Sequence, residues 1–129
     1  MKATIEQNKD GYGIYLQHGE YLITSMGETM SELLQNFNEA LELTLEGETS
    51  KEAESLRNWK PQFVIDMTYF PELFPAIDVS GLARYIGINP SLMRQYMSGI
   101  KKPSVERYKK INKGIHDLGR HYQQTVFDY

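Results

Sequence analysis

Apolar and polar positions alternate with a period of two in the first part of the chain, which is typical of β-strands. Three such runs cover residues 3–8, 13–18 and 21–26. Turn signals, Lys9-Asp10-Gly11 and His18-Gly19-Glu20, separate the runs. Because the connections are short, the pattern predicts an antiparallel meander.

After these runs the period changes to that of a helix. Thr29, followed three residues later by Glu32, forms a capping-box sequence in which each side chain can satisfy a free backbone N–H. Gly47 is typical of a helix end. The apolar positions that recur at helical spacing between these signals are Met30, Leu33, Leu34, Phe37, Leu41 and Leu45.

The region that follows this helix is harder to assign. Residues 48–60 are polar and fit either a loop or a short exposed helix around residues 53–56. Residues 62–70 are rich in β-branched and aromatic side chains, which predicts a fourth strand that carries Asp66.

Two prolines then mark a boundary between modules. Pro71 and Pro75 interrupt regular structure, so we expect residues 71–77 to be a linker. The expected architecture is α+β: a βββαβ antiparallel-sheet module over residues 1–70, followed by an all-α module over residues 78–129.

The second module has the pattern of a helix-turn-helix over residues 79–98. Gly87 stands where the turn needs a positive φ, and Ile88 is placed to anchor the turn in the core. Asn89 is a suitable N-cap and Pro90 a suitable first residue for the second helix. The apolar positions of the two helices, which we expect to face inward, are Leu82, Ala83, Ile86, Met93 and Tyr96.

A helix presented in this way can enter the major groove of DNA, although a plain helical hairpin has a similar pattern. The guanidinium fork of Arg94 fits guanine, and the amide of Gln95 fits adenine. We expect Ser91 and the amides at the helix start to hold phosphate, and Arg84 to clamp the backbone. The predicted DNA-binding residues are Arg84, Asn89, Pro90, Ser91, Arg94, Gln95, Ser98, Lys101 and Lys102.

A last helix is expected to begin after Ser104, and its surface adds further charge. Arg107 and Lys109 fit weaker phosphate contacts or solvated surface charges equally well. The apolar stripe predicted for this helix consists of Tyr108, Ile111, Ile115, Leu118 and Tyr122.

Charge divides the chain in the same way as the pattern does. The formal net charge is −3, but residues 1–76 carry −8 and residues 77–129 carry +5. A basic half is drawn to phosphate, and an acidic half either receives a basic partner or is simply a charged surface. The chain has no cysteine, no signal peptide and no long apolar run, so we expect a cytoplasmic protein without a membrane segment.

The first module resembles the HicB family of antitoxins. The resemblance is carried by Gly-Glu-Thr-Met-Ser-Glu-Leu (27–33) at the helix entrance, by Asn-Glu-Ala-Leu-Glu-Leu (38–43), and by the βββαβ order of residues 3–70. It implies a degenerate ribonuclease H-like domain, here followed by a Cro/repressor-like helix-turn-helix. It further implies an antitoxin that neutralises a small basic HicA-like ribonuclease toxin and represses its own operon.

Other chemistry has less support in the sequence. A single strand carboxylate, Asp66, cannot clamp two metal ions, so we expect no catalysis and no cofactor, although a retained nuclease activity stays open as an alternative. His116 and His121 lie off a common helix face. Aromatic residues fit either a sheet core or a platform for single-stranded RNA; they are Tyr12, Tyr15, Tyr21, Tyr69 and Phe70.

The expected partners follow from these two modules. They are double-stranded operator DNA, a HicA-like toxin, and a second copy of the chain, since two half-sites give DNA affinity that one small module rarely reaches. Exposed edge strands of a small sheet also favour pairing with another chain. The alternative is a stand-alone helix-turn-helix regulator whose first module mediates oligomerisation or ligand sensing.

Overall fold

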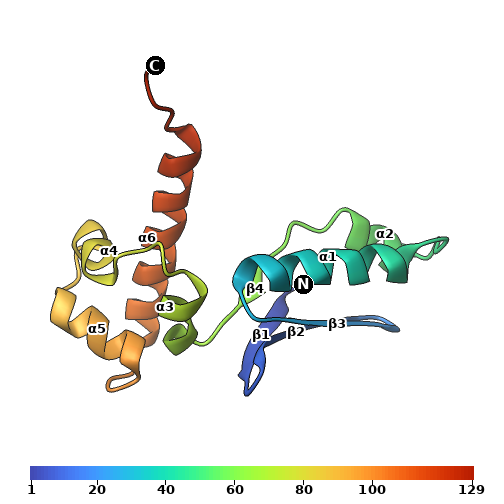
Figure 1. Ribbon diagram of the computed structural model, residues 1–129, viewed down its shortest axis with the longest axis horizontal. Coiled ribbons are helices and arrows are strands. Elements are labelled where there is room, and N and C mark those ends of the chain that lie inside the picture. Colours follow the sequence, from blue (N-terminus) through green and yellow to red (C-terminus); the bar gives the residue numbers. More distant parts are fainter. The chain divides into compact units, whose positions relative to one another are not determined.

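The computed structural model describes residues 1–129 and divides into two compact units, Met1–Leu73 and Phe74–Tyr129 (Figure 1). The protein is α+β, with one four-stranded sheet and six α-helices. None of the helices combines the length and the apolar content that crossing a lipid bilayer would require.

The sheet of unit 1 contains the expected meander. Strands β1 (Ala3–Asn8), β2 (Gly11–His18) and β3 (Tyr21–Gly27) are antiparallel, which confirms the three predicted runs. A short strand β4 (Phe63–Val64) pairs with β1 in the parallel direction, which gives the order β3-β2-β1-β4. The predicted sheet is therefore antiparallel only over its first three strands.

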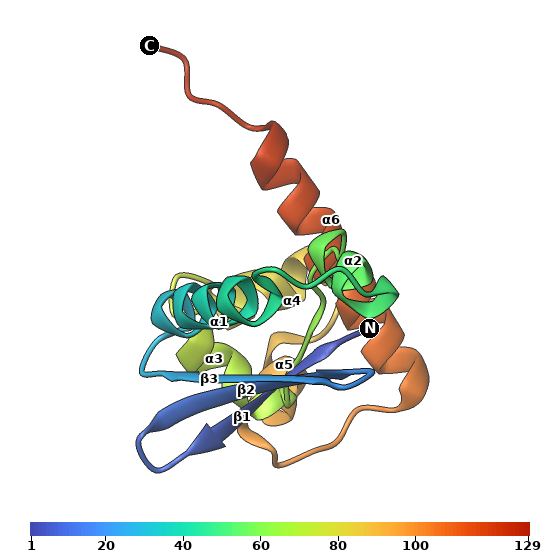
Figure 2. The same cartoon turned by 90° about the vertical axis from the view of Figure 1, so that its right-hand side faces the viewer.

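Helix α1 (Met30–Leu45) covers one face of this sheet (Figure 2). Thr29 is its N-cap, and the Thr29 hydroxyl accepts a 3.2 Å hydrogen bond from the Glu32 amide, which is one of the two bonds that the capping-box sequence predicts. Gly27 allows the sheet and the helix to approach closely, since a Cβ at this position would lie 2.5 Å from the Leu33 nitrogen. The side chains buried between sheet and helix include Ile5, Ile14, Leu16, Ile23, Leu33 and Phe37.

Residues 48–60, for which two alternatives were open, contain a helix, α2 (Lys51–Arg57). The Ser50 hydroxyl caps it by accepting a 3.1 Å hydrogen bond from the Ala53 amide. Ala53 and Leu56 are buried, so two apolar positions one turn apart hold this polar segment against the core.

The predicted fourth strand over residues 62–70 is wrong beyond Val64. Asp66 is the N-cap of a 3₁₀ turn, η1 (Met67–Tyr69), and its Oδ1 accepts hydrogen bonds from the amide and the hydroxyl of Thr68 at 2.9 and 2.7 Å. This local bonding ends the strand because it offers the backbone an alternative to the sheet ladder.

The predicted linker over residues 71–77 also begins too early. Pro71 lies in the first turn of helix α3 (Phe70–Leu73), where its missing N–H costs no hydrogen bond. Phe70 and Leu73 are buried, and the carboxylate of Glu72 bonds to the sheet, so this short helix belongs to unit 1.

Unit 2 consists of three helices, α4 (Val79–Ile86), α5 (Pro90–Ser98) and α6 (Val105–Gln124). Helix α4 packs on both other helices. Gly114 permits the close approach of α6, because a Cβ there would lie 2.4 Å from Cγ1 of Ile86. The stripe predicted for α6 is wrong at Tyr122, whose side chain is 63% exposed. At this level of the helix the adjacent His121 is the residue that meets Tyr85 of α4.

Candidate nucleic-acid interface

The turn between α4 and α5 has the geometry that its sequence predicts. Gly87 is left-handed, with φ of 88° and ψ of 35°, and its amide donates a 2.9 Å hydrogen bond to the Ala83 carbonyl. The amide of Ile88 donates to the same carbonyl at 2.9 Å, and its side chain is buried. Two hydrogen bonds and one apolar anchor therefore set the direction in which α5 leaves the turn.

The start of α5 is capped from within the chain. Oδ1 of Asn89 accepts hydrogen bonds from the amides of Ser91 and Leu92 at 2.9 and 3.2 Å, and Pro90 has no N–H to donate. The helix-start amides, which were expected to hold phosphate, are thus already occupied. A phosphate contact at Ser91 must come from its hydroxyl.

Helix α5 has a buried face and an outward face. Met93, Tyr96 and Met97 are buried. On the other side a shallow depression is lined by Ser91, Arg94, Gln95, Ser98 and Ile100. The predicted reading residues Arg94 and Gln95 therefore lie together on one outward surface, with Arg94 exposed and Gln95 half-buried.

Two serine hydroxyls hold the guanidinium of Arg94. Nη1 donates to Oγ of Ser80 on α4 at 2.6 Å, and Nη2 donates to Oγ of Ser91 at 3.1 Å. Both hydroxyls accept these hydrogen bonds as neutral groups, so no carboxylate of this chain offsets the charge of Arg94. A positioned cation with spare N–H donors is well suited to a base edge or a phosphate.

Arg84 is in a different environment from Arg94. Its Nη2 lies 4.0 Å from Oδ2 of Asp78, which is the N-cap of α4 and accepts a 3.1 Å hydrogen bond from the Gly81 amide. The neighbouring carboxylate neutralises part of the charge that a backbone clamp would need. Of the predicted cationic contacts, Arg84 is the one with a carboxylate of this chain beside it.

Lys101 and Lys102 follow α5 directly. Gly99 is left-handed at φ 81°, and the Lys101 amide donates a 3.2 Å hydrogen bond to the Gln95 carbonyl, which fixes the backbone next to the depression. Both lysine side chains are exposed and form no ion pair, whereas Lys109 lies 3.9 Å from Glu106. The two consecutive lysines are thus the freest cations at this end of α5.

Ile100 is a residue of this surface that the sequence pattern did not single out. Its side chain is 75% exposed and lines the depression together with Gln95 and Ser98. The available signal was an isoleucine between a helix-ending glycine and two lysines, where a polar residue would be expected.

The long helix α6 carries its own charge pairs. Asp117 accepts a 3.2 Å hydrogen bond from Nζ of Lys113 and pairs with Arg120. Lys113 is the main reason that the pKa of Asp117 is lowered, and Arg120 contributes.

His121 was expected not to share a ligand with His116 on the same helix. It shares a 2.7 Å hydrogen bond with the hydroxyl of Tyr85 on α4.

The carboxylates and aromatic residues of unit 1 were considered for metal binding and for base stacking. No three histidine, aspartate or glutamate side chains are grouped as metal ligands. Of the aromatic residues considered for base stacking, Tyr12, Tyr21 and Phe70 are buried in the core, and only Tyr15 is exposed at 43%. The aromatic set is thus divided between the core and the surface and forms no continuous platform.

Neither a protein-family model, nor a curated protein, nor a solved structure matches this chain.

Proposed function

We propose that this protein is a DNA-binding regulator of the HicB antitoxin type, which represses its own operon and neutralises a small basic HicA-like ribonuclease. The observation that carries the proposal is the α4–α5 pair, whose left-handed Gly87 and Asn89–Pro90 start present Arg94 and Gln95 outward. This is the way a recognition helix is offered to the major groove.

Charge supports DNA as the ligand of unit 2. Residues 77–129 carry a net charge of +5, and Lys101 and Lys102 lie next to the outward face of α5. Phosphate contacts from such lysines give affinity and set the register, whereas base contacts from Arg94 and Gln95 give specificity. Two copies of the chain on two half-sites would supply the affinity of an operator complex.

The DNA proposal is tested by gel-shift titration with the duplex that precedes the protein's own coding sequence. Arg94→Ala is expected to weaken binding by about 1–3 kcal/mol and to relax the preference at one base pair. Arg120→Ala, which removes an arginine that is already paired with Asp117 on α6, serves as the matched control and should change affinity little. Equal operator affinity for the wild type and Arg94→Ala would refute the reading role of Arg94.

The antitoxin part of the proposal rests on unit 1. Its element order is three antiparallel strands, a helix on one face, and a fourth strand, with α2 as an addition before β4. This order supports the resemblance to the HicB N-terminal domain. Residues 1–76 carry a net charge of −8, which would speed encounter with a basic toxin.

Co-expression with the product of the neighbouring reading frame tests this part. We expect that product to be a small lysine-rich protein that arrests growth when produced alone, and that growth recovers when this chain is added. Growth arrest that persists in the presence of this chain would refute the antitoxin function while leaving DNA binding intact.

A stand-alone regulator is the second candidate, and it is favoured by the same α4–α5 geometry. It predicts operator binding without any effect on the toxicity of a neighbouring gene product. Purified protein is expected to leave RNA intact in the presence of Mg²⁺ or Mn²⁺, whereas metal-dependent cleavage would favour the nuclease alternative.

A further inference from the structure

Unit 1 has a broad open groove of about 950 Å³ beside the second half of α1. Its walls come from the second half of α1, from α2 and from the segment that follows α2. The apolar lining includes Leu41, Leu43, Trp59 and Pro61. Leu43 lies two residues before the end of α1, and its side chain is 72% exposed.

One wall of the groove is acidic. Glu39, Glu42 and Glu46 line it, and their spacing of three and four residues places them with Leu43 along one stripe of the helix. All three glutamates are exposed, and none forms an ion pair within the chain. The stripe therefore offers three uncompensated carboxylates around an exposed apolar side chain.

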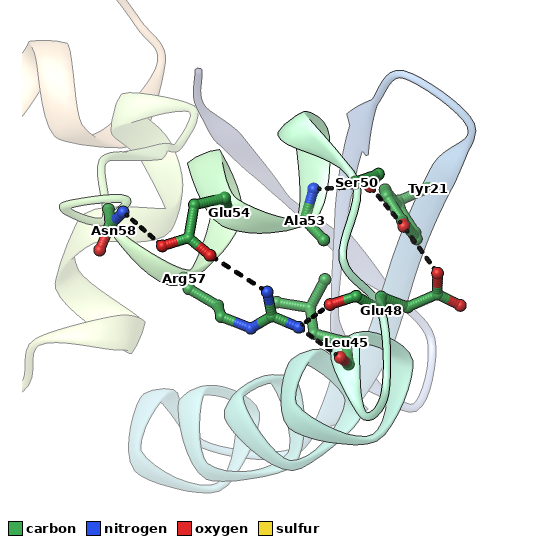
Figure 3. A network of polar contacts seen from close by, with 8 residues as sticks. All are labelled: Tyr21, Leu45, Glu48, Ser50, Ala53, Glu54, Arg57 and Asn58. Carbon is green, nitrogen blue, oxygen red and sulfur yellow. Dashed lines mark hydrogen bonds and ion pairs between the residues drawn. The ribbon is translucent and has the colours of Figure 1, made fainter.

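The single cation of the groove is already used by the protein itself. The guanidinium of Arg57 bonds to the carbonyls of Leu45 and Glu48, the first at 2.7 Å, and pairs with Glu54 at 3.3 Å (Figure 3). It thus binds backbone carbonyls at and just after the end of α1, and the carboxylates of the groove wall have no positive neighbour from this chain.

We infer that this groove is the docking site for a cationic amphipathic segment of a partner protein. Apolar side chains of the segment would cover Leu43 and Trp59, while its lysines or arginines would meet Glu39, Glu42 and Glu46. The inference deepens the proposed function, on which it rests for the existence of a basic protein partner.

Charge argues against the other possible occupants. A second copy that used the same groove would bring two rows of glutamates together, and like charges in contact oppose association. A nucleic acid would be repelled for the same reason. A cationic protein segment is the occupant that both the apolar floor and the acidic wall favour.

Trp59 allows the groove to be observed directly because it is the only tryptophan of the chain. Its ring is fixed by a 2.9 Å hydrogen bond from Nε1 to the Met1 carbonyl and by edge contacts with Phe37 and Phe63. The probe is a short amphipathic peptide of leucine and lysine, titrated into the full-length protein. Docking should shift the Trp59 emission, and a leucine–glutamate peptide of the same pattern should cause no shift.

The test variant is the double charge reversal Glu42→Lys with Glu46→Lys. Both side chains are exposed near the end of α1, which has no basic residue in its last turn, so lysines there should not disturb folding. We expect the leucine–lysine peptide to bind about tenfold or more weakly to this variant. Glu6→Lys with Glu20→Lys makes the same change in net charge outside the groove and should retain binding.

Three results would overturn the inference. One is an equal loss of binding in both double variants, which would indicate non-specific attraction. The second is peptide binding without a change in Trp59 emission. The third is that, in the co-expression assay, the Glu42→Lys, Glu46→Lys variant restores growth as fully as the wild type does. A wild type that fails to rescue would instead refute the proposed function, and the peptide titration would still decide the groove.

Discussion

The hydroxyl of Tyr12 on β2 donates a 2.6 Å hydrogen bond to Oε2 of Glu72 on α3, sixty residues further along the chain. The same oxygen accepts a 3.2 Å hydrogen bond from the side-chain Nε2 of Gln7 on β1. Two strands of the sheet thus hold the last short helix of unit 1. This contact explains why the chain continues as part of unit 1 up to Leu73.

Loss of this contact should loosen the end of unit 1. Tyr12→Phe keeps the buried ring but removes the hydroxyl, and we expect the free energy of unfolding to fall by about 1–2 kcal/mol, since the lost bond is to a charged acceptor. Urea denaturation measures the change. Tyr15→Phe is the control, because Tyr15 is 43% exposed and should lose almost nothing. Equal free energies of unfolding for Tyr12→Phe and the wild type would contradict a stabilising role for the hydrogen bond from Tyr12 to Glu72.

The same contact predicts a dependence on alkaline pH. Burial raises the pKa of Tyr12 to about 12, and the hydrogen bond to Glu72 and its negative charge contribute. A tyrosine in the unfolded chain has a pKa of about 10. The folded state therefore binds the phenolic proton more tightly than the unfolded chain does. The contribution of protonated Tyr12 to the free energy of unfolding is complete below about pH 10 and is lost as the pH rises towards about 12.

Thermal unfolding between about pH 8 and pH 11 tests this dependence. The melting temperature of the wild type should fall more steeply above about pH 10 than that of Tyr12→Phe. Parallel curves for the two proteins would show that another group causes the alkaline loss.

Two glycines of α6 predict opposite effects of the same substitution. A Cβ at Gly119 meets nothing within 4 Å, so Gly119→Ala should stabilise unit 2 by about 0.5–1 kcal/mol through helix propensity. A Cβ at Gly114 would lie 2.4 Å from Cγ1 of Ile86, an atom close to the backbone that cannot easily move. Gly114→Ala should therefore destabilise by about 1–3 kcal/mol. Stabilisation by both substitutions in thermal unfolding would show that α6 does not pack closely on α4.

Much of the fold follows from local signals in the sequence. Thr29 and Asn89 act as caps where they were expected, and Gly87 takes the left-handed conformation that its place in the turn requires. These features depend on a few adjacent residues, so the sequence alone is sufficient to predict them. The outward direction of Arg94 follows in the same way from the spacing of Met93 and Tyr96.

Features that depend on distant contacts could not be predicted. The apolar run at residues 62–70 favours a strand, but burial of Phe70 and the bond from Tyr12 to Glu72 favour a helix after Val64. The serine partners of Arg94 illustrate the same limit, because Ser80 lies fourteen residues before it and on another helix. Periodicity indicates which face a residue occupies but not which side chain it meets there.

Lys101 and Lys102 should contribute affinity without sequence preference. If each contacts one phosphate, alanine at either position should reduce the slope of log K against log salt concentration by about 1. The measurement is a gel-shift or fluorescence-anisotropy titration at several salt concentrations, with the operator duplex and an unrelated duplex. A loss confined to the operator would instead indicate that these lysines contact base edges.

Ile100 is expected to contact a thymine methyl group. Its side chain is 75% exposed beside Gln95 and Ser98, and an apolar contact is how proteins distinguish the methyl of thymine in the major groove. Replacing the contacted thymine by uracil should weaken wild-type binding by about 1 kcal/mol, the order of one buried methyl group.

A double-mutant cycle separates this contact from a general loss of binding. Ile100→Ala should weaken binding to the thymine operator by a similar amount and become insensitive to the uracil replacement. Val105→Ala, which removes a 69% exposed apolar side chain outside the depression, should retain the full uracil effect. If every thymine position shows the same uracil effect in the wild type and in Ile100→Ala, Ile100 does not read the methyl group. A contact between Ile100 and another protein would then explain why this side chain is exposed.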